Sequence, residues 1–535
     1  MHTKFIVVLG SLMSGLGKGA VTSSLLKILS MYHYKVLPMK FDGYLNYDCG
    51  TMNPYRHGEV FVLDDGGEVD MDFGMYERFL DVNLTKASSI TGGKLMDFIL
   101  KKEREGGYLG EDVQIIPHLT NEIKSRVLSF ASSNNLDFVL IEVGGTVGDM
   151  ENAYFIEAMR QLAIKEDVMF IDVTYIPQLN VVGEQKTKPA QSAFHLLMSA
   201  GVMPDFIVCR AEKEIESKTR KKLALFTSLD ENHIIDSSDL KTIYSLPLHF
   251  LDQGFDRLIF EKFKMKPKRI DKKELASWRQ LVEKIVSGSG EKVSIGIVGK
   301  YIHLRDSYAS VKEAIIHAAA ALGLEPDLKW IESEDLEKGD KSDVLNGLDG
   351  IIVPGGFGKR GIEGMINAIE YARKNSIPYL GLCLGMQLMA VEFARNACGL
   401  KGANSSEFDP SSKYKIVDLM PSQLSVKYKG ASMRLGSLDT KINEKGSIMY
   451  SSYKKSVIKE RHRHRYELNN KYRDILERNG LLITATTTDK KLVEALEWSG
   501  SFGIGVQSHP ELKSRLKAPA PLFLSFMKAA YNRQK

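Results

Sequence analysis

The sequence has few cysteines, and their spacing excludes two kinds of stabilised small domain. Four are present in 535 residues, at positions 49, 209, 383 and 398. None belongs to a Cys-x-x-Cys pair, so neither a disulfide framework nor a zinc knuckle is predicted. This usage fits a reducing compartment, and we expect a cytoplasmic protein.

Long hydrophobic runs, repeats and a charge excess are also missing. The apolar start, Phe5 to Leu9, is too short for a membrane span or a signal core and leads into a glycine-rich turn. We find no low-complexity tract and no repeat of solenoid length. The formal net charge of +5 is small for this length. We therefore expect neither a membrane nor a nucleic acid as partner.

The length and composition that are present predict a globular protein of several domains. Apolar residues make up 43% and charged residues 26%, and about 100 to 200 residues per domain gives two to four domains. A lysine-rich stretch containing Pro267, a helical pattern over Glu274 to Val286 and a Ser-Gly-Ser-Gly run indicate a linker. We predict domains over 1–265 and 292–535, a linker over 266–291, and two doubly wound α/β folds.

The most informative stretch of the second domain is Tyr379 to Gln387, where Cys383 lies between two glycines after an apolar run. A predicted strand over Ile377 to Leu382 and a predicted helix over Leu388 to Ala397 place this cysteine at a sharp turn. A helix N-terminus behind the sulfur favours the thiolate. A buried structural cysteine would fit this pattern equally well, so a nearby base is needed to decide.

A candidate base follows the predicted strand Phe502 to Val506, in the run Gln-Ser-His-Pro-Glu. His509 can accept the thiol proton, and Glu511 can hold the imidazole and stabilise its charged form. A lone His-Pro-Glu would more often be a loop. In combination with the cysteine turn it predicts a nucleophilic triad.

These motifs, together with the glycine turn over Val353 to Gly358, resemble the class I glutamine amidotransferases. The resemblance implies that Cys383 attacks the amide of glutamine, forms a glutamyl thioester and releases ammonia. It also implies an oxyanion hole made by backbone N–H groups near Gly356 and Leu384.

The first domain opens with a strand, a glycine loop and a helix, over Phe5 to Leu9, Gly10 to Gly19 and Val21 to Met31. Backbone N–H groups in such a loop hold phosphates, and Lys18 can reach the group being transferred. The loop departs from the usual P-loop, because six residues separate Gly10 from Gly17 and Gly19 replaces the magnesium-binding hydroxyl. A tight turn without a ligand remains an alternative.

Metal ligands must therefore come from elsewhere, and Asp72 and Glu142 are our candidates. Magnesium prefers hard oxygen ligands, so one or two carboxylates with phosphate oxygens suffice. Glu142 ends the apolar run Phe138 to Ile141, which predicts a buried parallel strand, and ligands bind at the carboxyl ends of such strands. For the acidic cluster around Asp72, a solvated turn is the alternative.

Seven further motifs resemble the CTP synthase family, in that family's order and over nearly the whole chain: Ser14 to Gly19, Tyr44 to Asn46, Gly50 to Thr51, His57 to Val62, Gly144 to Asp149, Lys186 to Pro189, and Arg461 to Glu467. The resemblance implies a P-loop-like synthetase (amidoligase) domain before the amidotransferase domain. Such an enzyme phosphorylates O4 of UTP with MgATP and lets ammonia displace the phosphate at C4. A homotetramer, activation by GTP and feedback inhibition by CTP are also implied.

The resemblance further implies roles for individual residues. Those expected to bind ATP are Gly15, Leu16, Gly17, Lys18, Gly19, Ala20, Lys40, Asp72, Asp239, Leu240 and Lys241. Those expected to bind UTP or CTP are Ser14, Asp149, Met150, Glu151, Lys186, Thr187, Lys188, Pro189, Ala190, Gln191 and Lys222. The expected glutamine pocket holds Gly356, Leu384, Gly385, Met386, Gln387, Glu407 and Arg465. Pro54, His57 and Val60 match the family's ammonia passage. The catalytic set is Cys383, His509, Glu511 and Lys18, with Asp72 and Glu142 at the metal.

The chain departs from the family pattern at several positions. Gly43 and Cys49 replace the usual residues near Tyr44, and Ala190 stands where threonine is usual. Loss of a hydroxyl contact at Ala190 would cost about 0.5 to 1.5 kcal/mol. Met150 conserves volume, so we expect CTP inhibition to survive. The segment after Leu419 is short, which bears on activation by GTP.

Two other functions are compatible with the motifs. The same modules could perform a different ATP-dependent amidation, although Lys186 to Gln191 and Asp149 to Glu151 favour a pyrimidine nucleotide. A filament-forming protein without catalysis is the other, and the intact catalytic positions argue against it.

Overall fold

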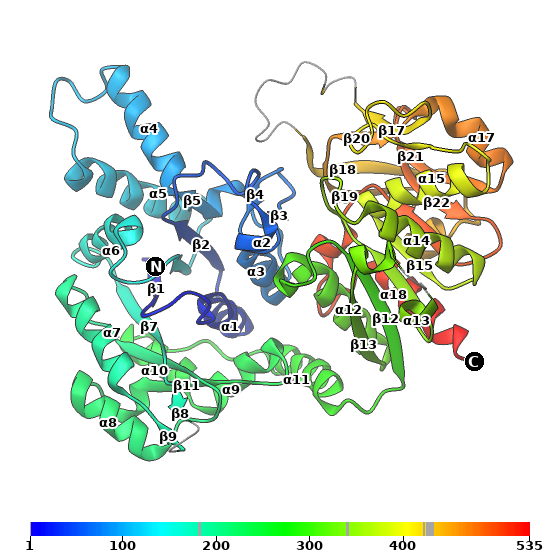
Figure 1. The fold of residues 1–535 in the computed structure, drawn as a ribbon. Coiled ribbons are helices and arrows are strands. Elements are labelled where there is room, and N and C mark those ends of the chain that lie inside the picture. Colours follow the sequence, from blue (N-terminus) through cyan, green and yellow to red (C-terminus); the bar gives the residue numbers. More distant parts are fainter. Residues whose placement is uncertain (1, 180–182, 339–341, 421–422, 424–432) are drawn as a thin grey trace. The chain divides into compact units, whose positions relative to one another are not determined.

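The computed structural model describes residues 2–179, 183–338, 342–420, 423 and 433–535 (Figure 1). It contains two compact units: Met1–Asp48 with Met75–Val286, and Cys49–Gly74 with Ser287–Lys535. We call Cys49–Gly74 the inserted segment, because it joins the second unit although it lies within the first unit's sequence. The short segment after Leu419 includes residues 421–422 and 424–432, which lie outside the described residues.

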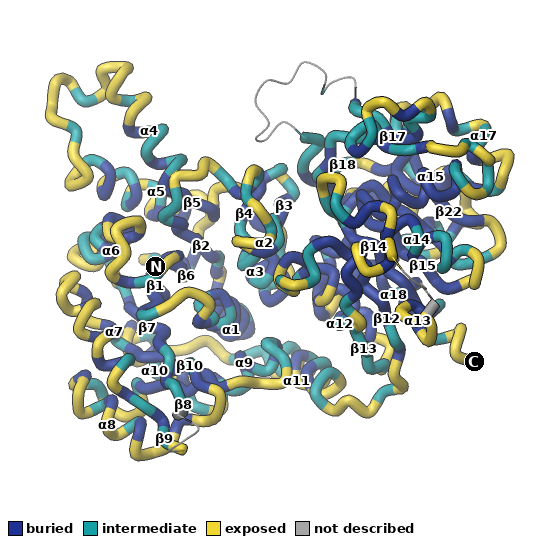
Figure 2. Tube along the Cα trace, in the orientation of Figure 1, coloured by how far each residue is buried: buried dark blue, intermediate teal, exposed yellow. Residues whose placement is uncertain are grey.

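The first unit is built on a seven-stranded parallel sheet with strand order β11-β10-β7-β1-β6-β2-β5. Its strands are β1 (Lys4–Gly10), β2 (Val36–Asp42), β5 (Ser89–Thr91), β6 (Phe138–Val143), β7 (Val168–Tyr175), β10 (Phe206–Ala211) and β11 (Ile234–Ser238). Both faces of a parallel sheet are covered, and the central strands are accordingly almost fully buried (Figure 2). The strand predictions at Phe5 and Phe138 are confirmed.

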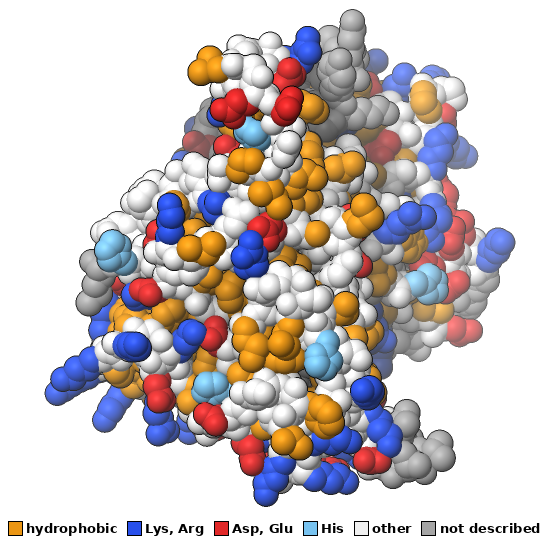
Figure 3. All heavy atoms as spheres, turned by 90° about the vertical axis from the view of Figure 1, so that its left-hand side faces the viewer, with side chains coloured by type: hydrophobic (Ala, Val, Ile, Leu, Met, Phe, Trp, Pro, Cys, Tyr) orange, Lys and Arg blue, Asp and Glu red, His pale blue; other side chains and the backbone are white. Residues whose placement is uncertain are grey.

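Helices flank this sheet: α1 (Lys18–Met31), α3 (Asp72–Leu80), α4 (Gly92–Arg104), α5 (Thr120–Ser133), α6 (Met150–Leu162), α7 (Lys188–Ser199), α8 (Ser217–Thr227), α9 (Leu246–Asp252), α10 (Phe255–Lys262) and α11 (Lys272–Ser287). A short hairpin joins β8 (Gln178–Leu179) to β9 (Glu184–Gln185). Figure 3 shows a face on which hydrophobic side chains lie among charged ones.

The predicted linker helix is α11, and it packs on the first unit. Trp278 is buried, its indole N–H donates to the carbonyl of Tyr244 at 2.9 Å, and the Lys27 ammonium lies 4.5 Å from its ring. Aromatic side chains bury a large area, so Trp278, together with the buried Val282, anchors the helix. The domain boundaries at 265, 266, 291 and 292 remain predictions.

The second unit is built on a nine-stranded sheet with strand order β13-β12-β14-β15-β23-β22-β21-β18-β19. These strands are β12 (Lys292–Gly299), β13 (Glu325–Glu332), β14 (Gly350–Val353), β15 (Tyr379–Leu382), β18 (Arg434–Ile442), β19 (Val457–His464), β21 (Leu481–Thr487), β22 (Val493–Trp498) and β23 (Gly503–Val506). Pairing is parallel from β13 to β23 and antiparallel from β23 to β19. Short connections permit the antiparallel half, whereas parallel neighbours need helical crossovers.

Helices cover both faces of the parallel half. They are α12 (Ala309–Leu322), α13 (Ser342–Leu345), α14 (Ile362–Lys374), α15 (Leu384–Asn396), α16 (Ile448–Tyr453), α17 (Arg473–Arg478) and α18 (Pro521–Arg533). Side chains of α14 and α15 share one apolar cluster, and those of α12 and α18 share another. A small sheet joins β16 (Asn404–Ser405), β17 (Lys415–Leu419) and β20 (Tyr466–Leu468). The predicted α/β class is confirmed for both units.

The inserted segment contributes α2 (Pro54–His57), β3 (Phe61–Val62) and β4 (Glu68–Val69) to the second unit. Phe61 and Val62 are fully buried there. In the described residues, no helix has the combination of length and hydropathy that crossing a membrane requires.

Candidate active site

Cys383 lies in the turn between β15 and α15, with φ 50° and ψ −96°. Positive φ is uncommon for a residue with a side chain, and the turn is possible because glycines flank it. A Cβ on Gly385 would lie 2.1 Å from the carbonyl oxygen of Val353, and one on Gly381 would lie 2.7 Å from the main chain of Gly385. The helix begins directly after the cysteine, four residues earlier than predicted, so its N-terminus favours a thiolate there.

His509 and Glu511 follow β23 and form the predicted acid–base pair. The Nδ1 atom of His509 lies 2.7 Å from Oε1 of Glu511. Burial alone would lower the pKa of His509, but the Glu511 carboxylate, together with the charge of Cys383 and a hydrogen bond to it, raises that pKa to about 10. Gly355 leaves room for the ring, since a Cβ there would lie 2.7 Å from its Cε1. The structure therefore brings the three predicted residues of the triad together.

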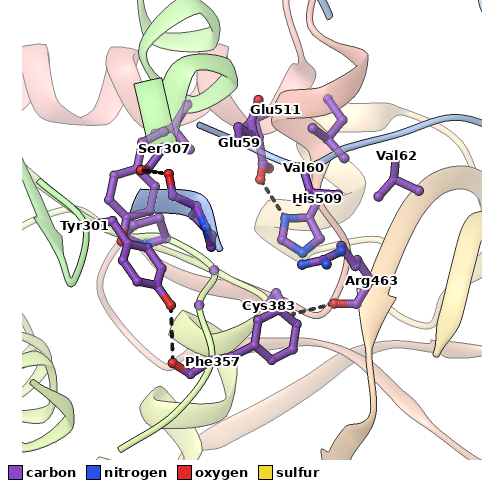
Figure 4. A pocket seen from close by; sticks show the side chains of 17 residues that line it. Glu59, Val60, Val62, Tyr301, Ser307, Phe357, Cys383, Arg463, His509 and Glu511 are labelled. Atoms are coloured by element: carbon purple, nitrogen blue, oxygen red, sulfur yellow. Dashed lines mark hydrogen bonds and ion pairs between the residues drawn. The ribbon is translucent and has the colours of Figure 1, made fainter. Parts of the chain in front are cut away.

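A cavity of about 80 Å³ opens beside the triad, and Figure 4 shows the side chains around it. Cys383, His509 and Glu511 line it, as does Gly356, on the glycine turn after β14. Another part of the lining comes from the inserted segment: Pro54, Glu59, Val60 and Val62. A space of this size admits molecules as small as water or ammonia.

Two of the three residues predicted for an ammonia passage, Pro54 and Val60, thus share a cavity with Cys383. His57 lies at the end of α2, outside the set of described residues that line the cavity. Sequence reasoning did not find Glu59, whose carboxylate accepts from the backbone N–H of Ser310 at 3.2 Å.

Ion pairs fasten the inserted segment to β19. Nε of Arg463 donates to Oε1 of Glu68 at 2.8 Å, and this carboxylate is 1% exposed. Nε of Arg461 lies 2.6 Å from Oδ1 of Asp64, and the Arg461 side chain is fully buried. Burial alone would raise the pKa of Asp64, but Arg461 lowers it below its usual value.

The alternation of arginine and histidine along β19 is a sequence pattern that could have revealed these contacts. Successive strand residues point to opposite faces. Arg461 and Arg463 contact the inserted segment, whereas His462 between them lies 2.8 Å from Glu494 in the interior. Residues 461 to 464 of this run are therefore part of a strand whose two faces have different partners.

The residues predicted to bind glutamine lie around the same turn. Gly385, Met386 and Gln387 are buried in the first turn of α15. Glu407 accepts from the backbone N–H of Gly358 at 2.8 Å, and burial raises its pKa. Leu384 immediately follows the nucleophile, and Arg465 donates to Gln423 at 2.7 Å.

Lys300 is a further candidate that the sequence interpretation missed. Burial lowers its pKa to about 8, opposed by the charge of Glu407, and its ammonium donates to the carbonyl of Phe357 at 3.3 Å. Lys300 directly follows the apolar strand β12, and a charged residue in that position was the pattern that could have revealed it, because strand ends carry functional groups.

In the first unit, the glycine loop has the predicted strand–loop–helix form between β1 and α1. Gly15 and Gly17 have φ values of 76° and 85°, a conformation that suits glycine. Lys18 begins α1, and its ammonium donates to the carbonyl of Gly145 at 2.6 Å. The carboxyl of Asp172 accepts from Ser11 at 2.6 Å, and burial raises its pKa to about 7. Ser14, Leu16, Gly19 and Ala20 lie in the same loop and first helical turn.

Glu142 follows the apolar run Phe138 to Ile141 and lies at the carboxyl end of β6, one residue before its last residue. It accepts a hydrogen bond from the Tyr76 hydroxyl, and the Lys40 ammonium lies 3.8 Å from it. Asp72 starts α3 and belongs to the second unit. In the described part of the chain, no cluster of three or more His, Cys, Asp or Glu side chains is arranged to hold a metal. Two carboxylates completed by phosphate and water would still match magnesium's preferences.

The residues predicted to bind the pyrimidine nucleotide lie on three elements of the first unit. Asp149 precedes α6, where Met150 is exposed and Glu151 follows. Thr187 precedes α7, which contains Lys188, Pro189, Ala190 and Gln191, and Lys186 pairs with Glu184 at 2.6 Å. Lys222 is on the exposed side of α8. Ala190 is 1% exposed within an apolar cluster that includes Ile176 and Phe194.

The residues predicted near the ATP base follow β11. Asp239 pairs with Arg210, and its backbone N–H donates to the carbonyl of Ala211 at 3.0 Å. Leu240 is 37% exposed, and the Lys241 ammonium donates to the carbonyl of Val286 at 3.4 Å.

Comparisons with known proteins agree on one family. Residues 4–265 match the model of the CTP synthase N-terminus, and residues 303–529 match that of class I glutamine amidotransferases. A CTP synthase of Carboxydothermus hydrogenoformans is 48% identical over 100% of this chain and 99% of its own length. One of Bacillus subtilis is 46% identical over 99% of this chain and 98% of its own. The glutaminase domain of Trypanosoma brucei CTPS with bound acivicin is 43% identical over 45% of this chain and 94% of its own, with a TM-score of 0.42. The chain therefore belongs to the CTP synthase family, whose members are ligases that form a carbon–nitrogen bond.

Proposed function

We propose that this chain converts UTP, ATP and glutamine into CTP, ADP, phosphate and glutamate, with the ammonia for the new bond released at Cys383. The observation that carries the proposal is the cavity beside the triad, one wall of which comes from a segment of the N-terminal sequence. An isolated glutaminase would have no use for such a wall. A cavity wall formed by residues of the synthetase part of the chain suits an enzyme in which the released ammonia reacts in a second step.

In the glutaminase reaction, the Cys383 sulfur attacks the carbonyl carbon of the glutamine amide while His509 holds the thiol proton. Glu511, 2.7 Å from the imidazole, keeps the ring oriented and stabilises its charged form. His509 then gives the proton to the departing ammonia, and water cleaves the thioester to glutamate. Backbone N–H groups near Gly356 and Leu384 would stabilise the oxyanion. Glu407, Arg465 and Lys300 are our candidates for the charged ends of glutamine.

In the synthetase reaction, the terminal phosphate of ATP moves to O4 of UTP, and ammonia then displaces it at C4. The loop from Gly15 to Ala20 would hold the phosphates, with Lys18 at the transferred group and Lys40 adding positive charge. Magnesium held by Asp72 and Glu142 would neutralise phosphate charge, which their hard oxygen donors suit. We propose that the residues predicted to bind UTP, and those predicted to lie near the ATP base, have these roles.

Regulation and assembly are also proposals. We infer feedback binding of CTP near Asp149 to Glu151, activation by GTP, and a homotetramer. Apolar side chains on α6 and α7 are exposed, among them Met150 (89% exposed) and Met198 (48% exposed). Their exposure supports an interface with another copy of the chain in which they would be buried. Because the Ala190 side chain is buried in an apolar cluster, residue 190 would act on the nucleotide site through packing.

The test is CTP formation, followed by chromatography, from UTP and MgATP with either glutamine or ammonium chloride. The wild type should use both nitrogen sources, and Cys383→Ala only ammonia, because free ammonia bypasses the thioester. Lys18→Ala should use neither, since it acts at phosphoryl transfer. Absence of CTP with either source in the wild type would refute the proposal.

A further inference from the structure

Gln507, the residue after β23, is fully buried and contacts the sulfur of Cys383. Its side-chain nitrogen lies 3.5 Å from Sγ, within hydrogen-bond range of a sulfur acceptor. The triad described above does not use this residue. A buried amide with such a contact requires an explanation, because burying polar groups is costly unless they are paired.

The orientation of the Gln507 amide follows from its neighbours. The nitrogen of Gln387 donates to the backbone carbonyl of Tyr466 at 3.0 Å and to Oε1 of Gln507 at 3.3 Å. A backbone carbonyl can only accept, so the Gln387 NH₂ must face it. The same NH₂ then requires the Gln507 oxygen on its side, which leaves the Gln507 NH₂ facing the sulfur. The chain from Tyr466 to Cys383 thus admits one arrangement of both amides, without the usual ambiguity of amide assignment.

We propose that Gln507 stabilises the thiolate of Cys383 by a hydrogen bond that Gln387 holds in the correct orientation. The inference rests on the proposed glutaminase function of this site. Hydrogen bonds to the charged form of a group favour that form, so the Gln507 donor adds to the helix N-terminus and His509 in stabilising the thiolate. Because the amide is neutral, it adds a donor without adding a charge that would perturb His509.

The charged groups around the sulfur come from several elements. His509 and Glu511 lie after β23, Arg463 on β19 and Glu59 on the inserted segment, and all four line the cavity with Cys383. The two carboxylates disfavour a thiolate, and the two cationic groups favour it. Gln507 acts beside these charges at every pH, because its own amide does not titrate.

The test compares the rate at which iodoacetamide alkylates Cys383 across pH in wild type, Gln507→Met and Gln507→Asn. Gln507→Met removes the donor at similar volume, and Gln507→Asn draws the amide back by one methylene. The Cys383→Ala variant gives the background from the other three cysteines. We expect the alkylation midpoint to rise by about one pH unit in both variants, and kcat/KM for glutamine hydrolysis at neutral pH to fall about tenfold. Ammonia-dependent CTP formation should be unchanged.

Gln534→Met is the matched control. This amide also belongs to the second unit and donates to the carbonyl of Lys292 and to Asp349, at the amino-terminal edge of the sheet. The alkylation midpoint of Cys383 in Gln534→Met should equal that of the wild type. An unmoved midpoint in folded Gln507→Met or Gln507→Asn would overturn the inference. If the wild type released no glutamate, the proposed function would fail, whereas the midpoints would still decide the role of Gln507.

Discussion

Breaking the ion pair that fastens the inserted segment to β19 should separate glutamine hydrolysis from CTP synthesis. The perturbation is Glu68→Leu. The Glu68 carboxylate is 1% exposed and lies 2.8 Å from Nε of Arg463, which is itself 13% exposed. Removing one partner of a buried pair leaves the other charge uncompensated, at a cost of about 3 to 5 kcal/mol. At about 1.4 kcal/mol per factor of ten, the closed arrangement of the segment becomes about 100 to 4,000 times less favoured.

The segment carries Pro54, Glu59 and Val60, so its displacement opens one wall of the cavity. Ammonia should then escape to solvent before it reacts. The assay measures glutamate and CTP in the same reaction. The ratio of CTP to glutamate should fall from near one to well below one, while CTP synthesis from added ammonia continues.

Two further variants make this prediction specific. Glu68→Leu combined with Arg463→Met removes both charges and should recover part of the ratio. Arg373→Met breaks the ion pair in which Nη2 of Arg373 lies 2.7 Å from Oε1 of Glu392. This pair joins α14 to α15, away from the cavity. The substitution should lower stability without changing the ratio. An unchanged ratio in Glu68→Leu, or an equal fall in Arg373→Met, would refute the reasoning.

Three other predictions concern protonation and backbone geometry. Glu511→Gln removes the carboxylate whose charge offsets the lowering of the His509 pKa by burial. The pKa of His509 should therefore fall from about 10, and the alkaline limb of the pH profile of glutamine hydrolysis should move to lower pH. An unmoved limb would contradict this. The folded-state pKa of Asp172 is about 7 against about 4 unfolded, so its ionisation costs stability as pH rises through that window. Asp172→Asn should therefore stabilise the first unit against heat at pH 8, by up to about 4 kcal/mol, and have little effect at pH 4. Gly385→Ala should abolish glutamine hydrolysis because its Cβ would meet a carbonyl oxygen of β14 at 2.1 Å, whereas Gly446→Ala, with no atom within 4 Å, should behave as wild type.

Local patterns in the sequence were enough to predict the strands and the triad. Apolar runs correspond to β1, β6 and β15, because buried parallel strands need continuous apolar residues. The Gly-x-Cys-x-Gly turn and the later His-x-Glu could be joined because the carboxyl ends of parallel strands meet at one edge. β15 and β23 are neighbours in the sheet, which brings Cys383 beside His509.

Long-range packing could not be predicted in the same way. Nothing local distinguishes the inserted segment from the rest of the N-terminal sequence, since its place depends on ion pairs with residues about 400 positions away. Likewise the helix over Lys272–Ser287 has a linker's composition, and only the buried Trp278 shows which unit it packs against. The direction of the Ala190 methyl, into an apolar cluster, also depends on neighbours that the local sequence does not specify.

The discontinuous second unit limits how this enzyme can be recombined with its relatives. A chimaera that exchanged residues 287–535 as a block would combine a foreign β19 with the original Asp64 and Glu68, and the two arginine pairs would depend on chance agreement between parents. It would also place Phe61 and Val62 against an unmatched surface. Residues 49–74 must therefore be transferred with the amidotransferase, so the smallest exchangeable glutaminase of this protein consists of two pieces of sequence.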